Sequence, residues 1–233
     1  MGKFCLYCEK PMREMESWTG LFHYEPKHLC KECQEGLLHI TGKRCVQCSR
    51  SLEKLPGELV RGDICLDCQR WEEDSEWKGV LSTNTSLFEY NPFLKVYLAR
   101  YKYRGDHILA QAFSNYIKKS LNSIEFDFIV AIPLSEERHY ERGFNQSTAF
   151  LEAASVTPSN ILTRAHTEKQ SKKPRQERLH QKQVFTLTEC NLTNKNILLF
   201  DDIYTTGITL RLAAILLKQA GAKQVSSLTL ARG

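Results

Sequence analysis

The chain has 233 residues, a formal net charge of +5 and 42% hydrophobic residues. This length is enough for one full domain and a smaller module, and no uninterrupted apolar run approaches the length of a membrane span. The first residues lack the apolar core of a signal peptide, so we expect a cytoplasmic protein that keeps its thiols reduced.

The charge of the chain is unevenly distributed. Residues 1–75 contain 11 Lys and Arg against 13 Asp and Glu, whereas residues 76–233 contain 21 against 14. Any attraction for polyanions is therefore expected from the C-terminal part of the chain.

The N-terminal part is rich in cysteine. Eight of the 9 cysteines form four CxxC pairs: Cys5 and Cys8, Cys30 and Cys33, Cys45 and Cys48, Cys65 and Cys68. Two such turns can complete a tetrahedral site of four thiolates, so we expect two structural zinc ions and a double zinc-ribbon module over residues 1–75. If the first CxxC pair shares a zinc ion with the second, and the third with the fourth, the loops between ligands are shorter than in an interleaved arrangement. We therefore favour this sequential pairing. Disulfides are the rival interpretation, and Cys190 is expected to be a free thiol.

The role of this zinc module follows less directly from the sequence. Four thiolates leave no open position on a metal, so the zinc is expected to be structural. Nucleic-acid binding is one interpretation of tandem ribbons, but the slightly negative charge of the module argues against it. We favour a docking surface for another protein.

The remaining elements predict an α/β domain over residues 85–233, after a polar linker at 71–84 in which Trp71 and Trp77 suggest partial docking. We expect strands at 85–90, 128–132, 160–162, 197–200 and 225–230, and helices from Asn91, from Ile108, over 144–155 and from Leu210. Strands that alternate with helices predict a mostly parallel sheet flanked by helices, with ligands at the carboxyl ends of the strands.

A basic turn follows the strand at 128–132. Ser135 lies just after Pro133, and Arg138 and Arg142 are spaced so that one helical face can carry both. Two guanidiniums on one face suit a pyrophosphate or a nucleic-acid backbone. The alternative is a solvated face on which these arginines pair with neighbouring glutamates.

A second basic segment spans residues 164–182. It contains seven Lys and Arg against two Glu, includes Lys172, Lys173 and Arg175, and lacks a sustained apolar stripe. We expect a mobile loop that closes over a phosphate ligand or binds a nucleic-acid backbone. A disordered basic loop without a ligand is the alternative.

The strongest motif follows the apolar strand at 197–200. Two adjacent carboxylates and a hydroxyl-rich turn precede the next helix: Asp201, Asp202, Thr205, Thr206, Gly207 and Thr209. The N–H groups of such a turn and the positive end of a helix suit a phosphate, and paired carboxylates suit a sugar diol or Mg²⁺. The sequence therefore predicts a sugar-phosphate site, with an ordinary Asp-capped turn as the alternative.

This motif resembles the 5-phosphoribosyl-1-pyrophosphate (PRPP) motif of type I phosphoribosyltransferases, and it matches at all six of those positions. The resemblance implies that the acidic pair contacts the ribose hydroxyls, with Mg²⁺ nearby, and that the turn holds the 5′-phosphate. It also implies that the turn after Pro133 is a pyrophosphate loop and that the segment 164–182 is a flexible hood.

The whole chain resembles the ComF family of DNA-uptake proteins. The resemblance rests on the CxxC pairs, the PRPP motif and four short segments at residues 103–106, 132–135, 142–146 and 169–173. It implies a competence factor in natural transformation, with a phosphoribosyltransferase-like domain. Such a factor handles incoming single-stranded DNA beside a helicase-like partner, which we expect to contact the zinc module.

Two other functions remain open at this point. A metabolic phosphoribosyltransferase would transfer ribose 5-phosphate from PRPP to an acceptor, but the sequence identifies no acceptor site. Such an enzyme also needs a general acid or base, and nothing singles out Glu168 or Glu177 for that role. The third interpretation is an adaptor with a relic PRPP site. We assign no catalytic residue.

Overall fold

The computed structural model describes residues 3–12, 26–103, 105–164, 184–188 and 190–233. Its strands are β1 (Lys3–Phe4), β2 (Pro11–Met12), β3 (Val60–Arg61), β4 (Ile64–Cys65), β5 (Asn84–Glu89), β6 (Phe128–Ala131), β7 (Leu162–Arg164), β8 (Phe185–Leu187), β9 (Asn196–Tyr204) and β10 (Gln224–Arg232). Its helices are α1 (Lys31–Glu35), α2 (Leu66–Glu73), α3 (Pro92–Tyr103), α4 (Ser114–Leu121), α5 (Glu136–Arg142), α6 (Gln146–Ala153) and α7 (Ile208–Gln219), with short 3-10 helices η2 (Gly57–Leu59) and η3 (His107–Phe113). No helix among these residues is both long and apolar enough to cross a membrane.

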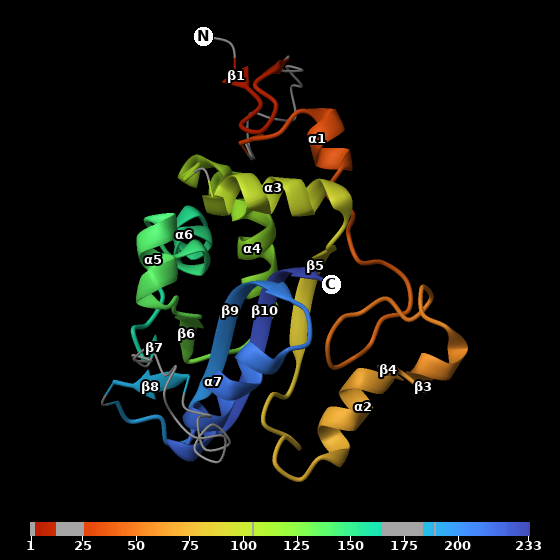
Figure 1. Ribbon diagram of the computed structural model, residues 1–233, viewed down its shortest axis with the longest axis vertical. Helices are drawn as coiled ribbons and strands as arrows, with labels where there is room; N and C mark the ends of the chain where they lie inside the picture. Colours follow the sequence, from red (N-terminus) through yellow and green to blue (C-terminus); the bar gives the residue numbers. More distant parts are fainter. Residues whose placement is uncertain (1–2, 13–25, 104, 165–183, 189) are drawn as a thin grey trace, which may run out of the picture.

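A parallel sheet of four strands forms the centre of the molecule, in the order β5-β10-β9-β6 (Figure 1). The predicted mostly parallel α/β fold is therefore confirmed. β9 pairs with β10 as far as Tyr204 and Arg232, whereas its pairing with β6 stops at Phe200 and Ala131. The last residues of β9 thus extend beyond the end of β6, where side chains can face a ligand.

The two faces of the sheet support two separate cores, because successive side chains of a strand point to opposite faces. Leu198 and Phe200 of β9 pack on one face with α3, η3, α4 and α6. Ile197 and Leu199 pack on the other face with α7. Both faces are buried, which explains the unbroken apolar run of residues 197–200.

Each CxxC-containing part contributes to a different one of these cores. Cys5 and Cys33 are buried in the core that contains α3 and α4. The second cysteine group, next to β3, β4 and α2, is buried with the core that contains α7. The division into domains at residues 1–75 and 85–233 stays a prediction, and the structure shows extensive packing between the two parts.

The segment predicted as a linker is folded against the rest of the chain. α2 continues to Glu73, and the rings of Trp71 and Trp77 meet edge to face with centroids 5.1 Å apart. Trp77 is buried. The docking that these two tryptophans suggest is therefore confirmed.

Two local predictions differ from the structure. The helix expected from Ile108 begins as the 3-10 helix η3, and the changed periodicity leaves Ile108 exposed rather than inward. The strand expected at 160–162 is β7, which pairs antiparallel with β8 outside the central sheet. The sequence analysis did not predict β8, which has three residues.

Candidate functional site

The eight CxxC cysteines form two groups in the pairing that short ligand loops favour. The sulfur atoms of Cys5, Cys8, Cys30 and Cys33 lie within 4.8 Å of one another, and so do those of Cys45, Cys48, Cys65 and Cys68. Sequential pairing is therefore confirmed, and we call these groups the first and second cysteine clusters.

The spacing of the sulfur atoms fits zinc rather than disulfides. The sulfur atoms of Cys8 and Cys30 are 3.6 Å apart, and those of Cys48 and Cys65 are 3.7 Å apart. A disulfide brings its sulfur atoms to about 2 Å. Four thiolates at about 2.3 Å from a zinc ion form a tetrahedron with edges of about 3.8 Å, close to the observed spacing. Cys190 is exposed and lies outside both clusters.

The first cysteine cluster is attached to helix α3. The ring of Tyr7, between Cys5 and Cys8, stacks on Tyr97 with centroids 4.9 Å apart and meets Phe93 edge to face. Arg100 Nη1 donates to the backbone oxygen of Tyr7 at 2.5 Å. This cluster therefore fixes the helix that leads to Lys102.

The phosphate-type turn lies between β9 and α7, as the sequence predicts. Gly207 has φ 83°, and a Cβ there would lie 2.2 Å from the hydroxyl oxygen of Tyr204, so the position requires glycine. Thr205 and Thr206 are exposed, and Thr209 is partly buried in the first turn of α7. The first N–H groups of α7 lack intrahelical partners, which makes this turn suitable for an anion.

The acidic pair lies on β9 just beyond the end of β6. Asp201 Oδ1 accepts hydrogen bonds from Ser147 Oγ at 3.1 Å and from the N–H of Asp202 at 2.9 Å. Asp202 forms an ion pair with Lys102 from the last turn of α3, and both side chains are largely buried. The sequence analysis missed Lys102 and Ser147 as site residues. Each lies next to a segment that it did use, 103–106 for Lys102 and 142–146 for Ser147.

The surroundings of Asp201 make its carboxyl group a weaker acid than usual. Burial and the adjacent Asp202 charge raise the pKa of Asp201 to about 7, although Lys102 and the hydrogen bond from Ser147 act in the opposite direction. A carboxyl group that resists ionisation in this way gains from a nearby cation. The pair is therefore suited to a bound divalent ion or a sugar diol.

The raised pKa of Asp201 predicts a specific dependence of stability on pH. Between its unfolded pKa of about 4 and its folded pKa of about 7, the folded chain holds a proton that the unfolded chain releases. The free energy of unfolding should therefore fall as the pH rises through this window. Asp201→Asn should remove that decline, which urea titrations of both proteins at several pH values can measure. A constant difference between the two proteins from about pH 4 to about pH 8 would contradict the assignment.

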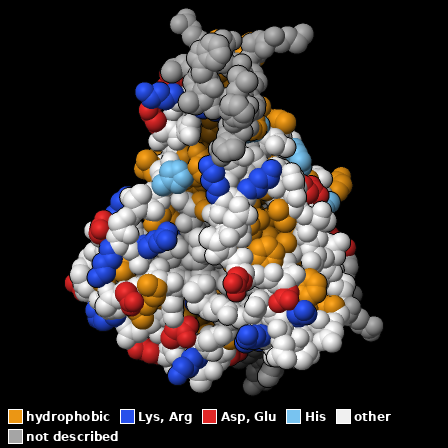
Figure 2. All heavy atoms as spheres, turned by 180° about the vertical axis from the view of Figure 1, so that it is seen from behind, with side chains coloured by type: hydrophobic (Ala, Val, Ile, Leu, Met, Phe, Trp, Pro, Cys, Tyr) orange, Lys and Arg blue, Asp and Glu red, His pale blue; other side chains and the backbone are white. Residues whose placement is uncertain are grey.

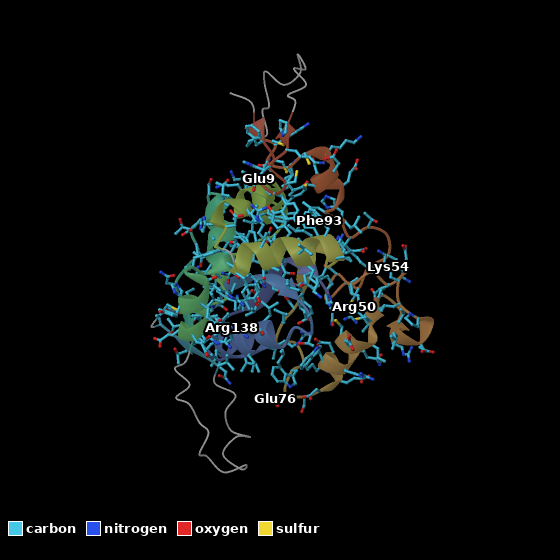
Figure 3. The ribbon with its side chains drawn as sticks, turned by 45° about the horizontal axis from the view of Figure 1, so that its top comes forward. Glu9, Arg50, Lys54, Glu76, Phe93 and Arg138 are labelled. Atoms are coloured by element: carbon cyan, nitrogen blue, oxygen red, sulfur yellow. The ribbon has the colours of Figure 1, made fainter. Side chains whose placement is uncertain are left out.

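The basic turn after β6 forms helix α5, the condition under which one face could carry both Arg138 and Arg142. Ser135 caps α5 by accepting a hydrogen bond from the N–H of Arg138 at 3.3 Å, and Arg138 is exposed (Figure 3). Arg142 differs: Nη1 donates to Gln146 Oε1 at 2.8 Å, and its guanidinium lies 5.7 Å from the ring centre of Tyr103. The two arginines therefore share a short helix, but only Arg138 extends freely toward solvent.

The neighbouring Asn145 and Phe144 position this turn. Asn145 caps α6 through its side-chain oxygen and donates from Nδ2 to the backbone oxygen of Ile132 at 3.0 Å. Phe144 packs edge to face on Tyr101 and His107. These contacts hold the end of β6 beside the acidic pair.

The predicted basic segment is described only at its first residue. At the end of β7, burial and the charge of Arg138 lower the pKa of Arg164, and the charge of Asp201 raises it. Lys172, Lys173 and Arg175 lie outside the described residues, as do Glu168 and Glu177.

Comparison with known proteins finds a matching family model and similar solved structures. The family model described as "Phosphoribosyl transferase domain" matches residues 156–233, which include the acidic pair and the turn. Among solved structures, the allosteric regulatory enzyme of purine biosynthesis covers 53% of this chain and 26% of its own, with 17% identity and a TM-score of 0.38.

Two ComFC proteins match almost the whole chain at more than 30% identity. Competence protein ComFC of Bacillus subtilis (strain 168) is 36% identical over 233 residues, which cover 98% of this chain and 94% of the relative. Competence protein ComFC of Streptococcus pneumoniae is 33% identical over 231 residues, 98% of this chain and 99% of the relative. DNA utilization protein YhgH of Escherichia coli O157:H7 is 32% identical over 113 residues, 46% of this chain and 49% of the relative. With its two clusters of four cysteines and its phosphoribosyltransferase domain, the chain belongs to the competence protein ComFC family.

Proposed function

We propose that this protein is a cytoplasmic competence factor in DNA uptake whose phosphoribosyltransferase domain binds PRPP. The observation that carries the proposal is the acidic pair of β9 next to the Gly207 turn and the start of α7. Carboxylates for a diol and free N–H groups for a phosphate lie within one short stretch of chain, as a phosphorylated ribose requires.

The arrangement suggests how PRPP lies in the site. The carboxylates of Asp201 and Asp202 accept hydrogen bonds from the ribose hydroxyls, and the turn at Thr205–Thr209 holds the 5′-phosphate. Lys102 already pairs with Asp202. Arg164, whose pKa responds to the charges of both Asp201 and Arg138, is proposed to contact the pyrophosphate together with Arg138. Mg²⁺, when bound with PRPP, supplies charge neutralisation for the pyrophosphate and for the acidic pair.

Single-stranded DNA is the second proposed ligand. Tyr103 and Tyr140 are 70% and 92% exposed, and Tyr103 directly follows Lys102, the partner of Asp202. Bases stack on exposed aromatic rings, and arginines such as Arg138 and Arg142 attract the phosphates. On the face seen from behind, Lys and Arg are interspersed with Asp and Glu (Figure 2). DNA is therefore proposed to bind beside the PRPP site, where residues 164–182 add a net positive charge.

The zinc module is proposed to contact a helicase-like competence protein. Its Lys and Arg do not outnumber its Asp and Glu, so a protein partner suits it better than DNA. Val46 and Leu38 are exposed apolar side chains in this part of the chain.

Replacing Lys172, Lys173 and Arg175 with Ala should weaken DNA binding and flatten its salt dependence. Each lost phosphate contact lowers the slope of log K against log salt by about 0.7 for a single strand, so the three together should lower it by about 2. Fluorescence anisotropy of labelled oligonucleotides from low to high salt measures this slope. Lys10, Lys31 and Lys43, all exposed and all in the zinc module, provide the matched triple-Ala control.

PRPP provides a competition test of the shared surface. Saturating PRPP with Mg²⁺ should displace the DNA from the wild-type protein. Unchanged DNA binding under those conditions would mean that the two ligands have separate sites. An equal loss of affinity in the control triple variant would move the DNA site to the zinc module.

Phosphoribosyl transfer is a second candidate function, favoured by one observation. An Asp with a pKa of about 7 can accept a proton from an attacking acceptor at neutral pH, and Asp201 meets that condition. The C1–pyrophosphate bond of PRPP would break as the acceptor forms its bond to C1. Release of pyrophosphate in the presence of candidate acceptors measures this activity.

A further inference from the structure

Arg232, the last residue of β10, connects the second cysteine cluster to the phosphate-type turn. Its side chain is buried, with 6% of the residue exposed. Nε and Nη2 are 3.4 and 3.5 Å from the sulfur of Cys48. On its other side, Nη1 donates to the backbone oxygens of Tyr204 at 3.2 Å and Thr205 at 2.9 Å. A single guanidinium therefore contacts a metal ligand and the first residues of the turn.

Burial makes these contacts important for Arg232. A buried guanidinium is costly unless charges or acceptors surround it. Arg232 Nη1 also donates to the backbone oxygen of Gly233, and the guanidinium lies 4.7 Å from the ring centre of Tyr204. Among the described partners of this side chain, Cys48 is the one that a bound metal keeps as a thiolate. Four thiolates around one zinc ion retain a net negative charge, so a filled second cluster attracts the guanidinium.

A second set of contacts joins the same cluster to the same turn. Trp71 lies on α2, the helix that also carries Cys68. Trp71 Nε1 donates to the backbone oxygen of Thr206 at 3.2 Å, and the guanidinium of the buried Arg211 lies 4.6 Å from the ring centre of Trp71. Arg211 Nη1 in turn donates to the hydroxyl of Tyr204 at 2.6 Å. Three consecutive residues of the turn are therefore held from the side of the second cluster.

The first cysteine cluster contacts a different part of the site. It contacts α3 through Tyr7 and Arg100, and so supports the side where Lys102 meets Asp202. The contacts described for its residues do not reach Thr205 or Thr206. Variants of the first cluster can therefore serve as controls for variants of the second cluster.

We propose that Arg232 is a positioning residue through which the second cysteine cluster controls the phosphate-type turn. When the cluster holds its metal, Cys48 fixes the guanidinium, and the guanidinium fixes the carbonyl groups of Tyr204 and Thr205. The N–H groups of the turn then point to one place, where a phosphate group binds. Loss of that metal loosens the turn and lowers its affinity for phosphorylated ligands. The ligand part of this inference rests on the proposed function, whereas the order of the turn does not.

Arg232→Lys tests the positioning role in the full-length, zinc-loaded chain. Lysine keeps the positive charge but cannot contact the sulfur and both carbonyl groups at once. Amide hydrogen exchange at residues 205–209 should speed up at least tenfold, while the zinc-to-protein ratio stays at the wild-type value. The affinity for PRPP should fall about tenfold. Arg100→Lys, which alters the corresponding contact of the first cluster, should leave exchange at residues 205–209 unchanged.

Cys65→Ser and Cys8→Ser test the dependence on metal. Each removes one ligand, from the second and the first cluster respectively, and leaves Cys48 in place. Cys65→Ser should lose its zinc and speed exchange at residues 205–209, whereas Cys8→Ser should lose its zinc without that change.

Two results would overturn the inference: wild-type exchange at residues 205–209 in Arg232→Lys, or the same acceleration in Cys8→Ser as in Cys65→Ser. If Cys65→Ser fails to fold, the comparison of Arg232→Lys with Arg100→Lys still tests the positioning role. Should wild-type protein bind no PRPP while the exchange results are as expected, the proposed ligand is wrong and the positioning role stands.

Discussion

Replacing Asp201 and Asp202 together with Asn is expected to weaken PRPP binding more than tenfold without unfolding the chain. Hydrogen bonds to charged groups contribute about 1.5–3 kcal/mol each, so the loss of both carboxylates exceeds the roughly 1.4 kcal/mol that corresponds to a factor of ten. Folding should survive, because burial and the neighbouring charge already disfavour the ionised form of Asp201. Calorimetric titration of PRPP with Mg²⁺ into the wild-type and double-variant proteins measures the difference.

Asp127→Asn is the matched control for this experiment. Asp127 precedes β6 at the amino ends of the strands, opposite the end that carries the acidic pair, and accepts hydrogen bonds from Lys195 and from the N–H of Asn196. The Asp127→Asn variant should lose some stability but keep its affinity for PRPP. A folded Asp201→Asn, Asp202→Asn double variant with wild-type affinity would show that the acidic pair does not bind the ligand.

Replacing Cys45 and Cys48 with Ser is expected to release one of two zinc ions and to unfold the region around the second cysteine cluster. Structural zinc contributes about 10–16 kcal/mol of apparent binding free energy in zinc-finger peptides, more than most small modules can lose and remain folded. The zinc-to-protein ratio should fall from about two to about one by elemental analysis. Hydrogen exchange should accelerate over residues 44–73.

Cys190→Ser controls for the loss of a thiol outside the clusters, and its zinc content should remain that of the wild type. A wild-type ratio near one would reject one of the two zinc sites. Disulfides in protein purified under reducing conditions would reject the metal assignment altogether.

The sequence predicted those features that depend on neighbouring residues. The CxxC pairs carry their own geometry, and the order of apolar strand, acidic pair, glycine turn and helix is sufficient to identify β9 and α7. The length of β9 was harder to predict from the sequence. Residues 201–204 continue the strand because β10 pairs with them as far as Arg232. That pairing is a tertiary contact, which the local sequence does not encode.

The side chains that complete the site were not predicted, because they come from distant parts of the chain. Lys102 resembles an exposed residue on the polar side of α3, yet it pairs with Asp202, one hundred positions later. Arg232 is, in the sequence, an ordinary residue at the end of a strand. Only the structure shows that its side chain contacts both Cys48 and Thr205. The inward position expected for Ile108 was wrong, since it assumed an α-helical period where a 3-10 helix forms.

Calorimetric titration of PRPP into the zinc-loaded full-length protein, with and without Mg²⁺, is the most direct test of the proposed function. The structure has a phosphate-type turn next to two carboxylates, so we predict saturable binding of one PRPP per chain that is tighter with Mg²⁺. Repeating the titration with bound single-stranded DNA should lower the apparent affinity. The result that would contradict the proposed function is no heat of binding at several temperatures. The protein used must retain its zinc and unfold cooperatively.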